Sequence, residues 1–148
     1  MKSPFIDLFA GCGGLSLGLE QAGFNPVYVN ELNKDALSTY LENRSEYEFL
    51  KSKKFHSNDI HELTKNNSTL SKLSKNLKNK FNISKGDLSL VVGGPPCQGY
   101  SGIGHRRSYK VDKEKIPSNY LYKEMYKVIE HFQPKAFIFE NVRGLLSA

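Results

Sequence analysis

The sequence predicts an α/β fold in which a mostly parallel sheet carries helices on both faces. Short apolar runs that are typical of strands alternate with segments whose apolar residues recur at helical spacing. This alternation favours a doubly wound sheet, and the unusual glycine-rich and proline-rich turns follow expected strands. Ligands bind such folds beyond the carboxyl ends of the strands, so a site is expected along that edge.

The first strand and helix meet at a glycine-rich turn. Pro4 to Phe9 is a short apolar run that ends in AGCGG, residues 10 to 14. Small and apolar residues then recur at helical spacing between Leu15 and Ala22, and Gly23 is expected to close the helix. The order is therefore strand, glycine turn, helix.

Two further strands and a capped helix follow. Val27 to Glu31 is expected to form the second strand, and Asn33 is suited to cap a helix with one apolar face. Phe55 to Ile60 is a third and weaker strand. These elements continue the alternation that a parallel sheet requires.

The segment from residue 63 to residue 86 is basic, with six lysines and no acidic residue. Leu63, Leu70, Leu73 and Leu77 have a spacing that a helix could place on one side. We interpret the segment as a solvated basic helix or a tolerated insert, with a nucleic-acid contact as the alternative.

The last two expected strands flank another helix. They are Leu88 to Gly93 and Ala136 to Glu140, and both are apolar runs. Between them Ser118 can cap a helix whose apolar face ends before Pro134. The sheet is thus predicted to have five strands.

Length and composition indicate one soluble domain. A chain of 148 residues can bury a sizeable core but is short for two domains of common size. It contains no apolar run long enough to span a membrane, and its start, MKSPFID, does not resemble a signal peptide. These features predict a cytoplasmic protein, associated with the nucleoid if the source is prokaryotic.

The cysteines, the histidines and the net charge indicate which kinds of site and partner the protein can have. Cys12 and Cys97 form no CxxC pair, and the four histidines show no metal-ligand spacing, so neither a disulfide framework nor a metal site is expected. The net charge of +6 favours a polyanionic partner, although many lysine-rich proteins share it.

The turn after the first strand is suited to a nucleoside. Gly11 and Gly13 begin the dinucleotide fingerprint, but Ser16 stands where its third glycine is expected. Glu31, at the end of the second strand, can accept hydrogen bonds from both hydroxyls of a ribose. Asp59, at the end of the third, is placed to accept one from an adenine amino group. Together these residues predict an adenosine site.

A second unusual turn follows the fourth strand. Pro95 and Pro96 restrict the backbone and are expected to hold Cys97 in one orientation. Cys97 is therefore a candidate nucleophile. The alternative is a small core residue, which most unpaired cysteines are.

The chain strongly resembles the DNA (cytosine-5)-methyltransferase family over almost its whole length. The likeness implies a Rossmann-like fold that binds S-adenosylmethionine, and transfer of a methyl group to carbon 5 of cytosine in DNA. It is carried by FIDLFAGCGGLSLGLEQAGF at 5 to 24, NEL at 30 to 32, NDI at 58 to 60, GGPPCQGYS at 93 to 101 and ENVRGLL at 140 to 146.

The resemblance implies two catalytic residues. Cys97 would add as a thiolate to carbon 6 of the base, and Glu140 would protonate ring nitrogen 3. A nearby positive charge such as Arg106 would favour the thiolate.

Binding residues are implied in the same way. The cofactor contacts are expected at Phe9, Gly11, Gly13, Gly14, Glu31, Leu32, Asp59, Ile60, Pro96 and Leu121. Residues 98 to 116 resemble the family's mobile loop, which closes over a cytosine flipped out of double-stranded DNA. Within it the phosphate contacts are expected at Ser101, His105, Arg106 and Arg107.

Residues 1–148 would correspond to the amino-terminal part of the catalytic domain. Ser118 stands where the family usually has an arginine, and the family's later arginine segment, target-recognition region and final helix have no counterpart in the sequence. We therefore expect this chain to be inactive alone, as a fragment or as a subunit that needs a complementary carboxyl-terminal segment. A restriction-modification system is one expected context.

Two other functions remain open on the sequence alone. The glycine turn with Glu31 is compatible with a nicotinamide-dependent oxidoreductase, although the missing third glycine and the proline-flanked cysteine speak against it. The positive charge and the short chain are compatible with a DNA-binding subunit that has no catalysis of its own.

Overall fold

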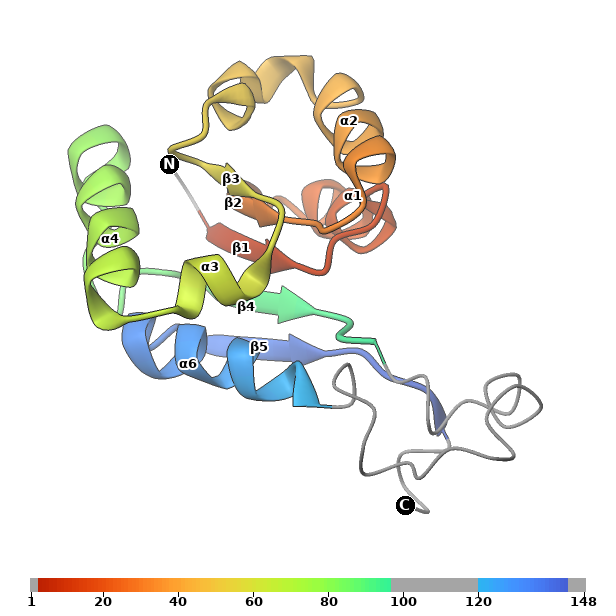
Figure 1. Cartoon of the computed structure of the whole chain (residues 1–148). Coiled ribbons are helices and arrows are strands. Elements are labelled where there is room, and N and C mark those ends of the chain that lie inside the picture. Colours follow the sequence, from red (N-terminus) through yellow and green to blue (C-terminus); the bar gives the residue numbers. More distant parts are fainter. Residues whose placement is uncertain (1–2, 97–119, 144–148) are drawn as a thin grey trace, which may run out of the picture.

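The structure is a computed structural model and describes residues 3–96 and 120–143. Within these residues, five parallel strands form one sheet in the order β3-β2-β1-β4-β5 (Figure 1). The strands are β1 (Pro4–Leu8), β2 (Asn25–Asn30), β3 (His56–Ser57), β4 (Leu90–Gly93) and β5 (Ala136–Phe139). The predicted parallel α/β sheet is confirmed.

Helices cover both faces of this sheet, as predicted. Phe5 of β1 packs with Leu19 of α1, whereas the next residue, Ile6, belongs to a cluster that includes Met125 of α6. Successive side chains of a strand point to opposite faces, so α1 and α6 lie on opposite sides of the sheet. The helices are α1 (Gly14–Gln21), α2 (Lys34–Glu42), α3 (Ile60–Thr64), α4 (Asn67–Phe81) and α6 (Tyr122–Phe132).

The chain order reverses between β1 and β4. From β1 the chain moves outward through β2 to β3, and then returns to place β4 on the other side of β1. Leu8 is in register with Asn30 of β2 and with Gly93 of β4, so the three carboxyl ends lie at the same level. Ligands of open α/β sheets bind at such a reversal, which is where the glycine turn lies.

The helix boundaries follow local signals in the sequence. Asn33 caps α2, because its side chain accepts hydrogen bonds from the backbone amides of Asp35 and Ala36. Gly23 follows α1 with a φ of 88°, a left-handed conformation that favours glycine.

The third strand is much shorter than the predicted Phe55 to Ile60. Only His56 and Ser57 pair with β2. The side chain of Asp59 accepts a hydrogen bond from the amide of His61 and caps α3, so Ile60 is the first residue of a helix and not the end of a strand. A local capping bond therefore ends the strand early.

The basic segment contains the expected helix, α4, with its lysines exposed, but it packs on the core, which corrects the alternative of a tolerated insert. Leu70, Leu73 and Leu77 of α4 are buried in the main hydrophobic cluster. Leu63 is also buried, but it belongs to α3. The lysines occupy the remaining faces, as expected for an amphipathic helix.

Two predicted boundaries near the end of the chain also change. Ser118, the expected cap, lies outside the described residues, and α6 begins at Tyr122 with Leu121 at the capping position. β5 ends at Phe139, so Glu140 follows the strand directly. A 3₁₀ helix, η1 (Ser45–Lys51), was not predicted and joins α2 to β3.

Among residues 3–96 and 120–143, no helix has the length and apolar character needed to cross a membrane. The same residues contain no group of three or more histidine, cysteine, aspartate or glutamate side chains that could hold a metal ion.

Candidate functional site

The glycine turn leaves β1 through three left-handed residues. Phe9, Gly11 and Gly13 have φ values of 58°, 55° and 90°. Such a conformation is uncommon for phenylalanine and concentrates at functional sites. Gly13 caps α1 without a side chain, and its amide donates to the carbonyl of Ala10 over 2.9 Å. We call residues 9–14 the glycine loop.

Glu31 is bound to the glycine loop. Its Oε2 accepts a hydrogen bond from the amide of Gly11 over 2.8 Å, and its Oε1 accepts one from the amide of Asn33 over 2.7 Å. These bonds fix the carboxylate between the ends of β1 and β2. A carboxylate can accept about four hydrogen bonds, so two ribose hydroxyls can still bind to it.

The expected adenine contacts lie around the start of α3. Asp59 accepts one hydrogen bond through Oδ1, from His61, as the helix cap. Ile60 is buried in the core, whereas Leu32 is 70% exposed beside Glu31. An exposed leucine next to a fixed carboxylate offers an apolar surface and hydrogen-bond acceptors, which is the combination that a nucleoside requires.

Ser16 has a packing role that explains the missing third glycine. It is fully buried, and its hydroxyl donates to Oδ2 of Asp7 over 2.5 Å and lies 2.8 Å from the hydroxyl of Tyr40. A glycine would leave both groups without this partner. The serine that replaces the third glycine of the dinucleotide fingerprint thus serves as a hydrogen-bond partner for Asp7 and Tyr40 in the core.

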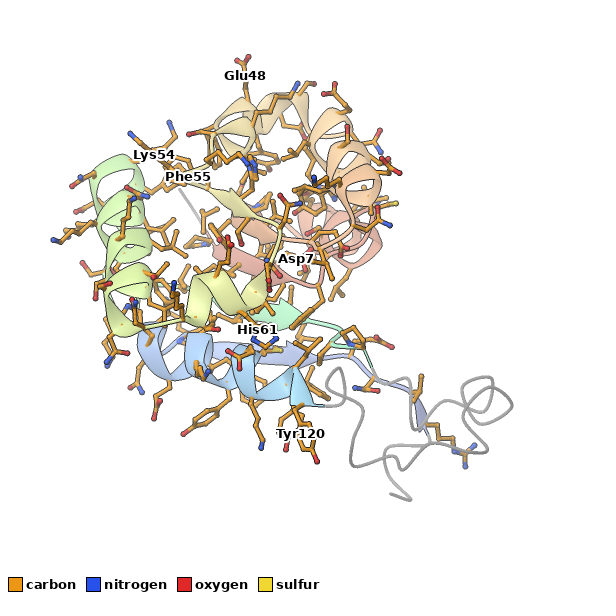
Figure 2. The ribbon with its side chains drawn as sticks, in the orientation of Figure 1. Asp7, Glu48, Lys54, Phe55, His61 and Tyr120 are labelled. Atoms are coloured by element: carbon orange, nitrogen blue, oxygen red, sulfur yellow. The ribbon has the colours of Figure 1, made fainter. Side chains whose placement is uncertain are left out.

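Asp7 is a buried acid beneath the glycine loop. Its side chain is 1% exposed in the interior of the molecule, whereas Glu48 points outward from η1 (Figure 2). Burial raises the pKa of Asp7 from 3.8 to about 7, although Ser16 and the Arg44 charge act in the opposite direction. At neutral pH the carboxyl group is therefore partly protonated.

Gly94 and Glu140 are neighbours at the ends of β4 and β5. A methyl group at Gly94 would lie 2.8 Å from Oε2 of Glu140. The amide of Glu140 donates to the carbonyl of Gly93, and Asn141 Nδ2 donates to the carbonyl of Pro95 over 3.4 Å. Glu140 is thus held next to the segment that leads to the proline turn.

The structure brings together most of the predicted site residues that it describes. The glycine loop, Glu31, Leu32, Asp59, Pro96 and Glu140 all follow the carboxyl ends of strands, and Leu121 borders the core at the start of α6. Pro96 is exposed. Cys97, Ser101, His105, Arg106 and Arg107 lie outside the described residues.

Two buried charged residues were not singled out from the sequence. Asp7 interrupts an apolar run, and this interruption could have drawn attention to it. Arg44 follows α2 in a polar stretch, and its contacts with Gly13 and Glu20 depend on the tertiary fold. No local signal distinguishes it from a surface arginine.

Comparison with known proteins yields one family. The family model of C-5 cytosine-specific DNA methylases matches residues 3–148. Type II methyltransferase M.AgeI of Thalassovita gelatinovora is 37% identical over 142 residues, and type II methyltransferase M1.HphI of Haemophilus parahaemolyticus is 37% identical over 148 residues. These matches cover 96% and 99% of this chain, but only 28% and 34% of the two relatives.

Solved structures share the fold. The S. pombe Dnmt2 methyltransferase matches 99% of this chain with a TM-score of 0.60 at 22% identity, and 38% of that structure is covered. A DNA modification methyltransferase encoded in an E. coli prophage matches 97% of this chain with the same TM-score at 28% identity, over 33% of its length.

Proposed function

Because the chain belongs to the C-5 cytosine-specific DNA methylase family, we propose that it forms the amino-terminal part of a catalytic domain that methylates DNA. The domain transfers a methyl group from S-adenosylmethionine to carbon 5 of cytosine. Its substrate is double-stranded DNA from which the target cytosine has been flipped. Because the chain spans 28% of M.AgeI, a complementary segment is expected to supply the rest of the enzyme.

The observation that supports this proposal best is the proximity of Gly94 and Glu140. It brings a carboxyl group next to the residues that precede the proline turn, and Cys97 follows that turn directly in the sequence. A nucleophile and an acid from adjacent strand ends could then approach the same base. Addition to carbon 6 of cytosine needs both groups at once.

In the proposed reaction the two protein groups activate the base. The Cys97 thiolate forms a bond to carbon 6 while Glu140 donates a proton to nitrogen 3, which leaves an electron-rich enamine at carbon 5. S-adenosylmethionine, when bound, supplies the electrophilic methyl group. Loss of the carbon 5 proton to water, departure of the Cys97 thiolate and return of the nitrogen 3 proton to Glu140 then restore the aromatic ring and release the methylated base, with S-adenosylhomocysteine as the other product.

The described residues fit the cofactor. Glu31 would bind the ribose hydroxyls, Asp59 the adenine amino group, and Leu32 the apolar face of the base. The glycine loop would approach the remainder of the molecule through its backbone, with Phe9 and Leu121 at the sides. Among residues 97–119, Ser101, His105, Arg106 and Arg107 would contact DNA phosphates.

The decisive experiment traps the covalent step in the full-length protein. DNA that contains 5-fluorocytosine should accumulate an adduct in the presence of S-adenosylmethionine, because the fluorine cannot leave as the proton does. Peptide mapping should find the base on Cys97 and not on Cys12, the other cysteine of the chain. An adduct on Cys12, or no adduct despite methyl transfer to ordinary DNA, would contradict the assignment.

Variants separate chemistry from cofactor binding. Cys97→Ser and Glu140→Gln should each lower the methylation rate by at least about 100-fold while the affinity for S-adenosylmethionine stays within about twofold. Glu48→Gln, on the exposed surface of η1, is the matched control and should change neither quantity. Binding of NAD with no binding of S-adenosylmethionine would favour an oxidoreductase instead.

A further inference from the structure

Arg44 is a buried arginine whose side chain contacts the glycine loop, α1 and α2. It follows α2 directly after the capping residue Asn43, and its side chain is 4% exposed. Burying a guanidinium is costly unless its charge and its N–H groups are satisfied. The hydrogen-bond partners of Arg44 therefore indicate which part of the structure this residue stabilises.

Each part of the guanidinium has a partner. Nε donates to Oε1 of Glu20 over 2.6 Å, Nη2 donates to the carbonyl of Gly13 over 2.9 Å, and Nη1 donates to the carbonyl of Tyr40 over 3.2 Å. The group also stacks over the Tyr40 ring, 3.8 Å from its centroid. Arg44 thus connects α1 and α2 to the glycine loop through rigid, planar contacts.

The guanidinium occupies the space that a side chain at position 13 would need. A Cβ atom on Gly13 would lie 2.5 Å from Nη1 of Arg44 and 2.7 Å from Cδ2 of Tyr40. Gly13 also has a φ of 90°, which favours glycine independently. Glycine at this position and arginine at position 44 are therefore structurally complementary.

The Gly13 carbonyl that Arg44 contacts is also the first acceptor of α1, since it accepts a hydrogen bond from the amide of Leu17 over 2.9 Å. The carbonyl of Gly13 and the amide of Gly14 belong to one planar peptide unit and point in opposite directions. Gly14 is the first residue of α1, and its N–H is one that the helix cannot satisfy itself. The Leu17 bond aligns the carbonyl with the helix and the Arg44 bond adds a second anchor, so the N–H of Gly14 is held pointing out of the helix N-terminus.

We propose that Arg44 is a positioning residue for the cofactor, which it orders through Gly13 without touching the ligand. This inference rests on the proposed function for the identity of the ligand. Glu31 holds the loop at Gly11 and Arg44 holds it at Gly13, so the loop is ordered before any ligand binds. Such preorganisation lowers the entropic cost of binding.

The test begins with loop order in the ligand-free full-length protein, measured by hydrogen exchange. In Arg44→Met, amides of residues 9–17 should exchange at least about tenfold faster, while those of β4 keep the wild-type rate. Arg44→Lys should be intermediate, because an ammonium group lacks the planar fork that reaches several acceptors. Lys51→Met is the matched control, since Lys51 contacts Glu42 on the surface, and it should leave the loop unchanged.

Titration with S-adenosylmethionine then measures the consequence for binding. Arg44→Met should raise the dissociation constant about tenfold over Lys51→Met, and Arg44→Lys should restore part of the affinity. Faster exchange over the whole chain, or a loop and an affinity equal to those of Lys51→Met, would overturn the proposal. If the wild-type protein binds no S-adenosylmethionine, the proposed function fails, and the exchange pattern alone decides whether Arg44 orders the loop.

Discussion

The strands next to the glycine loop and the strand next to Glu140 differ in how they are covered. All residues of β1 are buried, as are those of β2 from Pro26 onward, whereas every residue of β5 is exposed. Phe137 on β5 is 59% exposed, although it pairs in register with Val91, which is fully buried. In Figure 1, β5 forms one edge of the sheet, while β1 lies at its centre.

The polar groups differ in the same way. Beneath the glycine loop, Asp7, Ser16 and Arg44 are buried and hydrogen-bonded to one another or to the loop. Glu140 is exposed, and among the described residues its backbone amide is bonded to the carbonyl of Gly93. The contrast indicates that the proposed cofactor side is preorganised by this chain itself. An exposed apolar edge such as β5, by comparison, is a surface on which further protein commonly packs.

The largest expected effect is on the free energy of unfolding, which distinguishes the buried strand β1 from the exposed strand β5. Leu8→Ala should lower the free energy of unfolding by about 2 to 5 kcal/mol, because Leu8 is fully buried and the change leaves a cavity. Phe137→Ala should cost less than about 1 kcal/mol, as is usual for an exposed side chain. Urea denaturation of the 148-residue chain, without any complementary segment, measures both. A cost above about 2 kcal/mol for Phe137→Ala would show that another element covers β5.

A second effect comes from Asp7, beneath the glycine loop, and makes the stability of the fold depend on pH. Because burial raises the pKa of Asp7 to about 7, the folded state keeps a proton that the unfolded state releases near pH 4. Stability should therefore fall as the pH rises from about 4 to about 7, and then level off. Asp7→Asn keeps a neutral side chain at all pH values and should remove this decline, which amounts to roughly 4 kcal/mol at most.

Thermal unfolding between pH 4 and pH 8 checks this expectation. Asp35→Asn, at an exposed position in the first turn of α2, serves as the control and should retain the wild-type decline. An Asp7→Asn protein that loses stability over this range as steeply as the wild type would contradict a raised pKa at Asp7.

The smallest effect concerns affinity and compares Glu31 with a surface acid. Glu31→Ala should weaken binding of S-adenosylmethionine by about 1 to 3 kcal/mol, since the ribose hydroxyls and the amide of Gly11 both lose their acceptor. Glu42→Ala, which removes an exposed carboxylate of α2, should leave the affinity unchanged. Calorimetric titration gives both values, and equal affinities of the two variants would refute the ribose assignment.

The sequence predicted the architecture well where local signals and burial agree. The alternation of apolar runs and helical periodicity located all five strands, and Asn33 and Gly23 marked helix ends correctly. Prediction failed where local and tertiary effects compete. The capping bond of Asp59 shortened β3, and the leucine spacing of α4 was recognised in the sequence while its burial against the sheet and α6 was not.

The candidate site was predictable in part. Residues that follow strands converge automatically in a parallel sheet, so the proximity of Gly11 to Glu31 was foreseeable from their positions. Arg44 was not, because its partners Gly13 and Glu20 are distant in sequence and become neighbours only when α1 packs against α2. The roles of Cys97 and of the four expected DNA contacts remain predictions.

The central position of β1 also affects how the protein is made. Ile6 pairs with Tyr28 on one side and with Val91 on the other, so its two neighbours are synthesised at very different times. At about 10 residues per second, β4 leaves the ribosome roughly ten seconds after β1 does. During that interval β1 has an unpaired edge, even though it becomes the most enclosed strand of the finished sheet. A nascent chain of this family member therefore exposes one edge of β1 for seconds, and a chaperone that binds extended, largely apolar segments would find its target there.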